Sequence, residues 1–347
     1  MERNFTRREI PSAAPRPDWW RVRVEEIREI CENVKRLRRE VVATTPGGFP
    51  VYAFSVGAES KHNRVNWPSA TGSPHPQVYA ENDPQVVMVV AGIHAEETEG
   101  VCTALNLLSL LDTGKDLLGR ENAELLALCS RYRLVILPCV NMDGRAIAPD
   151  CLMGCTQADY GPILTWLDDG SVLKWPDLKE HFPMPMERVT QLGTYYNADG
   201  YNIMLDCAPG NIHTAEAQAL LRLADRERID LFLNMHSCTY NSHVIVPSVM
   251  NYPGNVRTVM EIRRRFNERM GRAPDRTPPR RDPQTDINAA VTLATGAAPL
   301  TFEFDALTVR PFEAKVEDGY AILDVILRLG LERPLCDRAT ILTPTPE

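Results

Sequence analysis

Apolar residues along the chain alternate between short β-branched runs and longer segments with helical spacing. The short runs cover residues 50–56, 85–92, 133–140, 230–235, 243–248 and 298–304. Helical spacing covers residues 20–42, 97–112, 117–131, 213–227, 255–270, 285–296 and 316–330. Such an alternation predicts an α/β fold, with a largely parallel sheet flanked by helices.

One long segment interrupts this alternation. Residues 149–195 are rich in Pro, Asp and Trp and are interpreted as a surface insertion. No internal repeat, low-complexity tract or shift in composition marks a domain boundary. We therefore expect a single domain over residues 1–347, with its core at about 20–330.

Polar and ionisable side chains follow four of the predicted strands directly. They are His94, Glu96 and Glu97; Asn141, Asp143 and Arg145; His236 and Ser237; and Glu303 and Asp305. In open α/β sheets the ligand crevice lies beyond the carboxyl ends of the strands. We therefore expect these residues to face one crevice.

Two histidines and several carboxylates at one rim match the ligands of a catalytic zinc, which keeps one position for water. His94 and Glu97 lie three residues apart across a strand-to-helix turn, and His236 would supply a third ligand. Glu303 would stay free as a general base for water, whose pKa bound zinc lowers to about 7. A second His-x-x-Glu, His213 to Glu216, follows no apolar strand, so Glu216 is interpreted as an acidic residue in a first helical turn.

In this order, His94, Glu97, His236 and Glu303 give the chain a resemblance to the zinc carboxypeptidase family, the funnelins. AGIHAEETEG resembles the first metal motif of the family, PCVNMDGR its Asn-x-Asp-Gly segment, LFLNMHS its third-ligand strand and PLTFEFD its catalytic-glutamate segment. The resemblance implies a three-layer α/β/α sandwich on a mixed, mostly parallel sheet of about eight strands. It also implies one Zn²⁺ on His94, Glu97 and His236, with Glu303 as the general base that later protonates the leaving amine.

The chain departs from the family where peptidases usually carry an Asn-Arg pair that grips the substrate carboxylate. Here the segment GYNIMLD at 200–206 places Met204 and Leu205 at the expected pair. Leucine cannot make the paired charge-assisted bonds of arginine, so ordinary C-terminal trimming is in doubt. Arg280 and Arg281 would replace that grip, unless they form a solvated charge pair beside Asp282.

Other polar residues complete the set of candidates. Arg145 is the candidate oxyanion-stabilising residue, with surface solvation as the alternative. Asp305 would share the side of Glu303 and orient a substrate amine, with a salt bridge to a neighbouring arginine as the alternative. The remaining substrate-binding candidates are Asn141, Asp143, Asn202 and Ser237.

The composition limits which partners and which cellular compartment are expected. The 46 acidic and 38 basic residues give a formal net charge of −8, which disfavours nucleic acid and anionic membranes. The N-terminus MERNFTRREI is charged where a signal peptide would be apolar, and no apolar run is long enough to span a bilayer. Together with nine scattered cysteines, which suit a reducing compartment, this predicts a cytoplasmic protein.

Three functions remain open. The first is a carboxypeptidase-like zinc hydrolase of amide bonds in a small or unusual peptide. The second is a deacylase of N-acyl amino acids, as in the related aspartoacylase and succinylglutamate desuccinylase branch. The third is a non-catalytic binding protein on the same scaffold, which the retained ligands and Glu303 disfavour. The oligomeric state does not follow from the sequence.

Overall fold

The structure is a computed structural model of the chain. It describes residues 5–59, 84–173, 177, 183–208, 210–248, 251, 253–279, 281 and 285–336.

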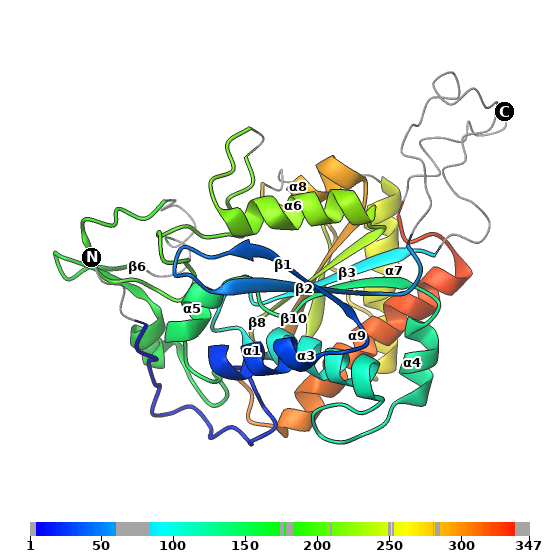
Figure 1. Cartoon of the computed structure of the whole chain (residues 1–347), viewed down its shortest axis with the longest axis horizontal. Coiled ribbons are helices and arrows are strands. Elements are labelled where there is room, and N and C mark those ends of the chain that lie inside the picture. The colour runs from blue at the N-terminus through cyan, green and yellow to red at the C-terminus, as the bar shows by residue number, and fades with distance from the viewer. Residues whose placement is uncertain are drawn as a thin grey trace.

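A seven-stranded mixed sheet runs through the centre of the molecule (Figure 1). Its strands are β1(Arg38–Thr44), β2(Pro50–Val56), β3(Val86–Ala91), β4(Arg133–Leu137), β8(Leu231–Thr239), β9(His243–Ile245) and β10(Ala298–Asp305), in the order β1-β2-β4-β3-β8-β10-β9. The four central strands β4, β3, β8 and β10 are parallel, and the three outer pairings are antiparallel. The predicted α/β fold with a mixed sheet is confirmed.

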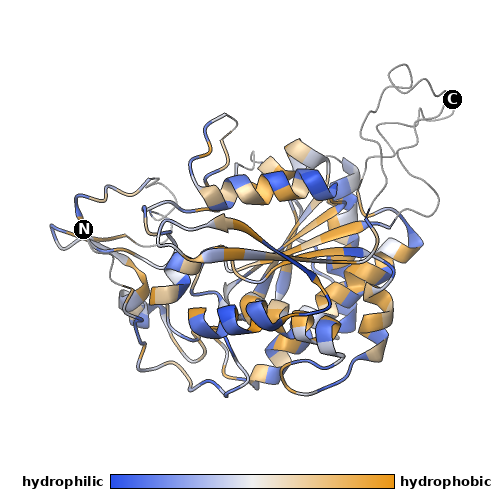
Figure 2. Cartoon of the chain, in the orientation of Figure 1, coloured by the Kyte–Doolittle hydropathy of each residue, from blue (hydrophilic) through white to orange (hydrophobic). Residues whose placement is uncertain are grey.

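Helices cover both faces of this sheet (Figure 1). One face carries α6(Ala215–Glu227) and α8(Ile287–Thr295), and the other carries α1(Val24–Asn33), α3(Thr98–Thr113), α4(Ala123–Cys129), α7(Pro253–Arg269) and α9(Phe312–Glu332). Successive side chains of β8 point to opposite faces of the sheet. Leu231, Leu233 and Met235 pack in the core beneath α3 and α9, whereas Phe232 packs in the core beneath α6 and α8. Figure 2 shows the apolar strands between helices whose outer surfaces are polar.

The predicted helix at 20–42 is too long. Helix α1 ends at Asn33, and its C-cap Val34 is already extended, with φ −62° and ψ 131°. The following residues form the edge strand β1, which pairs antiparallel with β2 through a bulge between Val41 and Ala43. Val41 is 52% exposed on this edge. The sequence pattern was misleading because an exposed, charged edge strand has no buried face to impose a period of two.

The 149–195 segment builds a small structure of its own beside the main sheet. It contains the 3-10 helices η1(Gln157–Asp159) and η2(Gly161–Ile163), followed by the antiparallel strands β5(Thr165–Leu167), β6(Val172–Leu173) and β7(Val189–Gln191). Leu167, Leu173, Met184 and Tyr196 pack together as its core. Because Tyr196 lies just beyond the segment, this core joins the insertion to the chain that follows.

Two further observations bear on the environment of the chain. In the part of the chain that the structure describes, no helix combines the length and apolar character needed to cross a bilayer. The eight cysteines with described side chains are free thiols, and seven of them are buried.

Close packing seats α3 on the sheet. A Cβ atom added to Gly100, in the first turn of α3, would lie 2.8 Å from Met235 Cβ and 3.3 Å from Ala91 Cβ. Only a glycine therefore lets α3 approach β8 and β3 this closely. This contact sets the distance between the N-terminus of α3 and the end of β8.

We expect Gly100→Ala to lower the free energy of unfolding by about 1–2 kcal/mol. Alanine favours a helix over glycine by up to about 1 kcal/mol, but overpacking of this kind costs about 1–3 kcal/mol. Urea denaturation measures the difference. Gly161→Ala is the control, because its nearest neighbour would lie at 3.8 Å, and a Gly100→Ala protein as stable as wild type would contradict the packing argument.

Candidate metal centre

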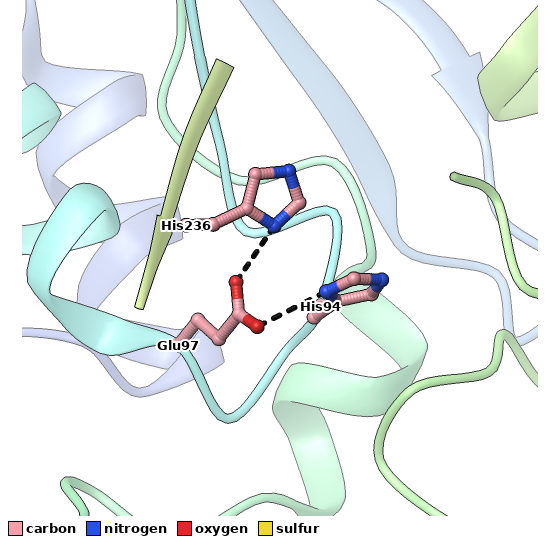
Figure 3. A group of neighbouring side chains, drawn as sticks. All are labelled: His94, Glu97 and His236. Carbon is pink, nitrogen blue, oxygen red and sulfur yellow. Dashed lines mark hydrogen bonds and ion pairs between the residues drawn. The ribbon is translucent and has the colours of Figure 1, made fainter. Parts of the chain in front are cut away.

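His94, Glu97 and His236 meet in one buried cluster at the carboxyl end of the sheet (Figure 3). The Nδ1 atom of His94 lies 3.0 Å from Glu97 Oε1, and the Nδ1 atom of His236 lies 2.8 Å from Glu97 Oε2. One candidate ligand atom from each residue falls within 4.8 Å of the others, and no other such group occurs among the described residues. Three ligand-bearing side chains, 6% exposed or less, thus converge on one point.

Strand ends and a tight turn bring these residues together. After β3 the chain turns at Gly92, whose φ of +63° favours glycine and whose Cβ would lie 2.8 Å from Cys139 Sγ. The Gly92 carbonyl accepts a hydrogen bond from Asn141 N at 2.8 Å, which ties the turn to the end of β4. Glu97 then stands at the N-cap of α3, while His236 lies near the end of β8.

A second layer of residues holds the cluster in place. The ring of Tyr195 lies on that of His94, with centroids 4.2 Å apart. Thr194 donates its hydroxyl to Glu96 Oε2 at 2.8 Å, and the backbone N–H of Ser237 donates to Glu97 Oε2 at 3.1 Å. Residues 194–195 therefore link the start of α3 to the insertion.

Burial and neighbouring charge act in opposition on the cluster. Burial alone would raise the pKa of Glu97, but the two imidazoles outweigh it and lower this pKa to about 2. Burial would lower the pKa of His236, whereas the charge and hydrogen bond of Glu97 leave it raised. Glu96 has no such partner, and burial followed by the charge of Glu97 raises its pKa to about 8. Glu97 is thus the anionic centre of the group.

The donor set fits zinc. Two imidazoles and one carboxylate are a known ligand set of catalytic zinc sites, with bonds of about 2.0–2.2 Å and tetrahedral ligands roughly 3.4 Å apart. In the cluster the histidine Nδ1 atoms lie 2.8 and 3.0 Å from the Glu97 oxygens, and no two of the three candidate ligand atoms are more than 4.8 Å apart. The spacing required by zinc falls within this range. A cation between them would replace the hydrogen bonds that now join the three side chains.

Glu303 lies beside this cluster and outside it. In the parallel pairing of β10 with β8, Glu303 is opposite His236, and in the pairing with β9 it is opposite His243. It is not one of the three clustered residues, yet its charge contributes to the raised pKa of His236. Glu303 therefore lies next to the cluster, on the neighbouring strand.

Three residues predicted to act on substrate have their polar groups committed to the protein. Arg145 is 1% exposed and donates to the backbone carbonyls of Ala95, Ala148 and Pro149, which contradicts both an oxyanion role and surface solvation. Asn141 caps α5(Met142–Ile147) by accepting from Gly144 N at 2.9 Å. The Asp143 carboxylate accepts from Thr45 Oγ1, Gly47 N and Ala198 N. They brace loops behind the cluster instead of facing substrate.

Two further candidates also have structural roles. Ser237 follows the alternation of β8, which places its side chain on the α3 side of the sheet together with Met235, and it contributes to the pKa of the buried Glu99 there. Asp305 forms an ion pair with Arg310 at 3.6 Å and accepts from Thr308 N, as the alternative interpretation of this residue predicted. The carboxylate of Asp305 is thus engaged by the chain that follows β10.

Three candidates remain. Arg281 is exposed, and Arg280 lies outside the described residues. Asn202 is fully buried, and its Oδ1 accepts from Met204 N at 3.0 Å. Its Nδ2 atom has no hydrogen-bond partner in the structure, so Asn202 keeps a free donor.

The second His-x-x-Glu pair, His213 and Glu216, belongs to no group of potential metal ligands among the described residues. His213 donates its backbone N–H to Asp206, and its ring lies against Tyr201. Glu216 is fully buried in the first turn of α6 and accepts from Asn197 Nδ2 at 3.2 Å. Burial raises its pKa to about 7. The prediction that Glu216 is an acidic residue in a first helical turn is therefore confirmed, and the structure adds that this carboxyl group is buried.

Sequence reasoning missed Thr194 and Tyr195, which lie at the end of a long insertion without any motif. It also missed Asn234, although an amide in the apolar run LFLNM, two residues before His236, is a usable signal.

A mixed α/β sheet with two histidines and a glutamate at its carboxyl edge defines the class of metal-dependent hydrolases with one ion. The family model of zinc carboxypeptidases matches residues 25–299. The chain therefore belongs to the zinc carboxypeptidase family. No protein with curated annotation matches the chain.

Solved structures share the fold at low sequence identity. The chain aligns with the metallo-carboxypeptidase of Burkholderia cenocepacia at 15% identity and a TM-score of 0.54, over 87% of this chain and 66% of that one. It aligns with the Pseudomonas aeruginosa metallo-carboxypeptidase, in complex with (2-guanidinoethylmercapto)succinic acid, at 14% identity and a TM-score of 0.55, over 89% and 68%. The chain thus spans about two thirds of the length of these proteins.

We expect Glu216→Gln to stabilise the protein at high pH only. The carboxyl group ionises near pH 4.5 when unfolded and near 7 when folded, so the unfolded chain binds fewer protons between these values. The free energy of unfolding that the protonated Glu216 contributes is therefore lost as pH rises from 4.5 to 7. Glutamine does not ionise, so it avoids this loss, and its side-chain oxygen still accepts from Asn197. The gain should reach about 3 kcal/mol at pH 8 and vanish at pH 4, as measured by urea denaturation. An equal effect at both pH values would contradict the assignment.

Proposed function

We propose that the protein is a zinc-dependent hydrolase of amide bonds that acts like a carboxypeptidase on a small peptide. The observation that carries this proposal is the buried cluster of His94, Glu97 and His236 with Glu303 opposite His236 on the next strand. Family membership supports it independently. A binding protein on this scaffold would need no carboxylate at position 303.

Each residue has a distinct role in the proposal. His94, Glu97 and His236 would hold the zinc, which would supply Lewis acidity toward water and the scissile carbonyl. Glu303 takes the proton from the attacking water and passes it to the leaving nitrogen. Tyr195 keeps His94 in position, and Thr194 holds the Glu96 side chain. Asn202 donates its free Nδ2 to a substrate oxygen.

The substrate differs from that of a carboxypeptidase with an arginine grip. Met204 is buried and Leu205 is half-buried, so apolar side chains stand at the expected pair, and Arg145 is committed to backbone carbonyls. We therefore propose a small peptide substrate whose recognition does not depend on a paired arginine. With eight free thiols among the described residues, we also propose that the protein works in a reducing compartment such as the cytoplasm.

Glu303→Gln should keep zinc and lose activity. Glutamine preserves the shape of the side chain but cannot accept the proton, so we expect kcat to fall by about 10²–10⁴-fold. Zinc content is measured by elemental analysis, and hydrolysis is measured with short peptides. Glu313→Gln, an exposed change in α9, is the control.

Two results would contradict this role of Glu303. Unchanged turnover would remove it from the chemistry, and lost zinc would make it a ligand. His236→Ala is the complementary variant, and it should lose zinc as well as activity.

The choice of substrate class needs its own comparison. We expect the zinc-loaded protein to hydrolyse short N-blocked peptides at least tenfold better, in kcat/KM, than N-acetylated or N-succinylated single amino acids. A peptide extends to both sides of the scissile bond and so offers more binding energy than a single acylated amino acid. The reverse preference would identify a deacylase instead.

A further inference from the structure

Asn234 places an amide on the sheet face that carries the candidate site. It precedes His236 by two residues on β8, so both side chains lie on the same face, about 7 Å apart along the strand. In the parallel pairing it is opposite Thr301, just as His236 is opposite Glu303. The pair of Asn234 and Thr301 therefore lies two residues before the proposed zinc ligand and base, on the same face of the sheet.

A chain of hydrogen bonds fixes how this amide is turned. Asn234 Nδ2 donates to Asn288 Oδ1 at 3.0 Å, and Asn288 Nδ2 donates to Thr301 Oγ1 at 3.1 Å and faces Asp286 Oδ2 at 3.5 Å. A carboxylate only accepts, so Asp286 keeps the nitrogen of Asn288 on its own side. The oxygen of Asn288 must then face Asn234, which leaves Asn234 Oδ1 pointing away from the network.

This oxygen has no partner. Asn234 is fully buried, and its Oδ1 atom makes no hydrogen bond in the structure. An unsatisfied buried acceptor costs about 1–3 kcal/mol, and nearly all buried polar groups avoid that cost. The neighbouring residues of the strand are apolar, so an aliphatic side chain would suit this position better for stability alone. Because the unpaired Asn234 oxygen lowers the stability of the fold, its presence at this position indicates that it accepts a hydrogen bond from a ligand.

We propose that Asn234 determines specificity by accepting a hydrogen bond from an N–H group, amide or amine, on the side chain of the residue that is released. The proposal rests on the proposed function, because Glu303 protonates the leaving nitrogen and Asn234 lies on the side of Glu303. Met204, whose Sδ atom lies 3.5 Å from Asn234 Nδ2, covers the amide with a flexible side chain that a ligand can displace.

Charge excludes a carboxylate from the same position. Asp286 Oδ2 lies 3.5 Å from Nδ2 of Asn288, the partner of Asn234, and Glu303 follows Thr301 by two residues on β10, so two acidic groups lie beside this part of the site. A third carboxylate would meet an acceptor oxygen and two like charges. A donor group, in contrast, satisfies Asn234 and is attracted by the acids. The sheet therefore selects glutamine-like or lysine-like side chains over glutamate-like and leucine-like ones.

The test compares four peptides that differ only in the C-terminal residue: Gln, Lys, Glu or Leu. With the zinc-loaded wild-type protein we expect kcat/KM for Gln or Lys to exceed that for both Glu and Leu by at least tenfold, because a site built for a hydrogen bond rejects analogues that lack it. The better of the Gln and Lys peptides identifies the carboxamide or the amine as the preferred donor. Glu or Leu hydrolysed as well as both would overturn the proposal.

Two variants separate recognition from folding. Asn234→Leu should reduce the ratio of the Gln or Lys peptide to the Leu peptide at least tenfold, and a ratio that stays at the wild-type value would overturn the role of Asn234. Asn234→Asp keeps the shape and adds a charge, so it should shift preference toward Lys over Gln by at least tenfold. Ratios within one variant do not change if a variant is merely less stable.

Binding of the free amino acids by calorimetry gives a readout that needs no turnover. Glutamine or lysine should bind the zinc-loaded wild-type protein at least tenfold more tightly than glutamate and leucine, and Asn234→Leu should remove the difference. If this preference holds while no peptide is hydrolysed, the proposed function is wrong and the specificity site stands. If peptides are hydrolysed without preference, only the specificity site is wrong.

Discussion

The candidate site depends on one buried carboxylate. Glu97 accepts from two imidazoles that are 3 and 139 residues away in the chain, and thereby joins the end of β3 to the end of β8. A carboxylate without partners in this interior would be strongly disfavoured. Because the imidazoles lower its pKa to about 2, Glu97 remains charged where burial alone would neutralise it. The helix that carries Glu97 reaches this place only because Gly100 lets it pack directly on Met235.

A frame of hydrogen bonds keeps this carboxylate in position. The Arg145 guanidinium holds the Ala95 carbonyl, and Thr194 holds Glu96, so both residues between His94 and Glu97 are fixed from behind. Asp143 joins the turn at Thr45 and Gly47 to Ala198. Polar residues at strand ends thus divide into those that meet at the site and those that support it. Such supporting groups fix ligand orientation as firmly as the ligands themselves do.

The sequence predicted the parts of the molecule that follow from chain periodicity. Strands β2, β3 and β10 lie where their apolar runs indicate, and His94, Glu97 and His236 meet because parallel strands end at the same edge. The edge strand β1 was missed because an exposed strand carries no buried face. Strand-end position alone could not separate Arg145 from the metal residues, because both follow apolar strands directly. That distinction depends on which backbone carbonyls come near the side chain, which only the folded chain determines.

The acidic excess of the chain has a different meaning once burial is known. The formal charge of −8 counts Glu96 and Glu216, but burial raises their pKa values to about 8 and about 7. Glu96 is thus mostly protonated near pH 7 and Glu216 is about half protonated, and the charge that remains at the site belongs to Glu97 and its neighbours Glu303 and Asp286. These anions surround two imidazoles that cannot both be protonated without cost in a buried site. A divalent cation neutralises the carboxylates without protonating the histidines, so metal binding and the stability of this edge of the sheet are coupled.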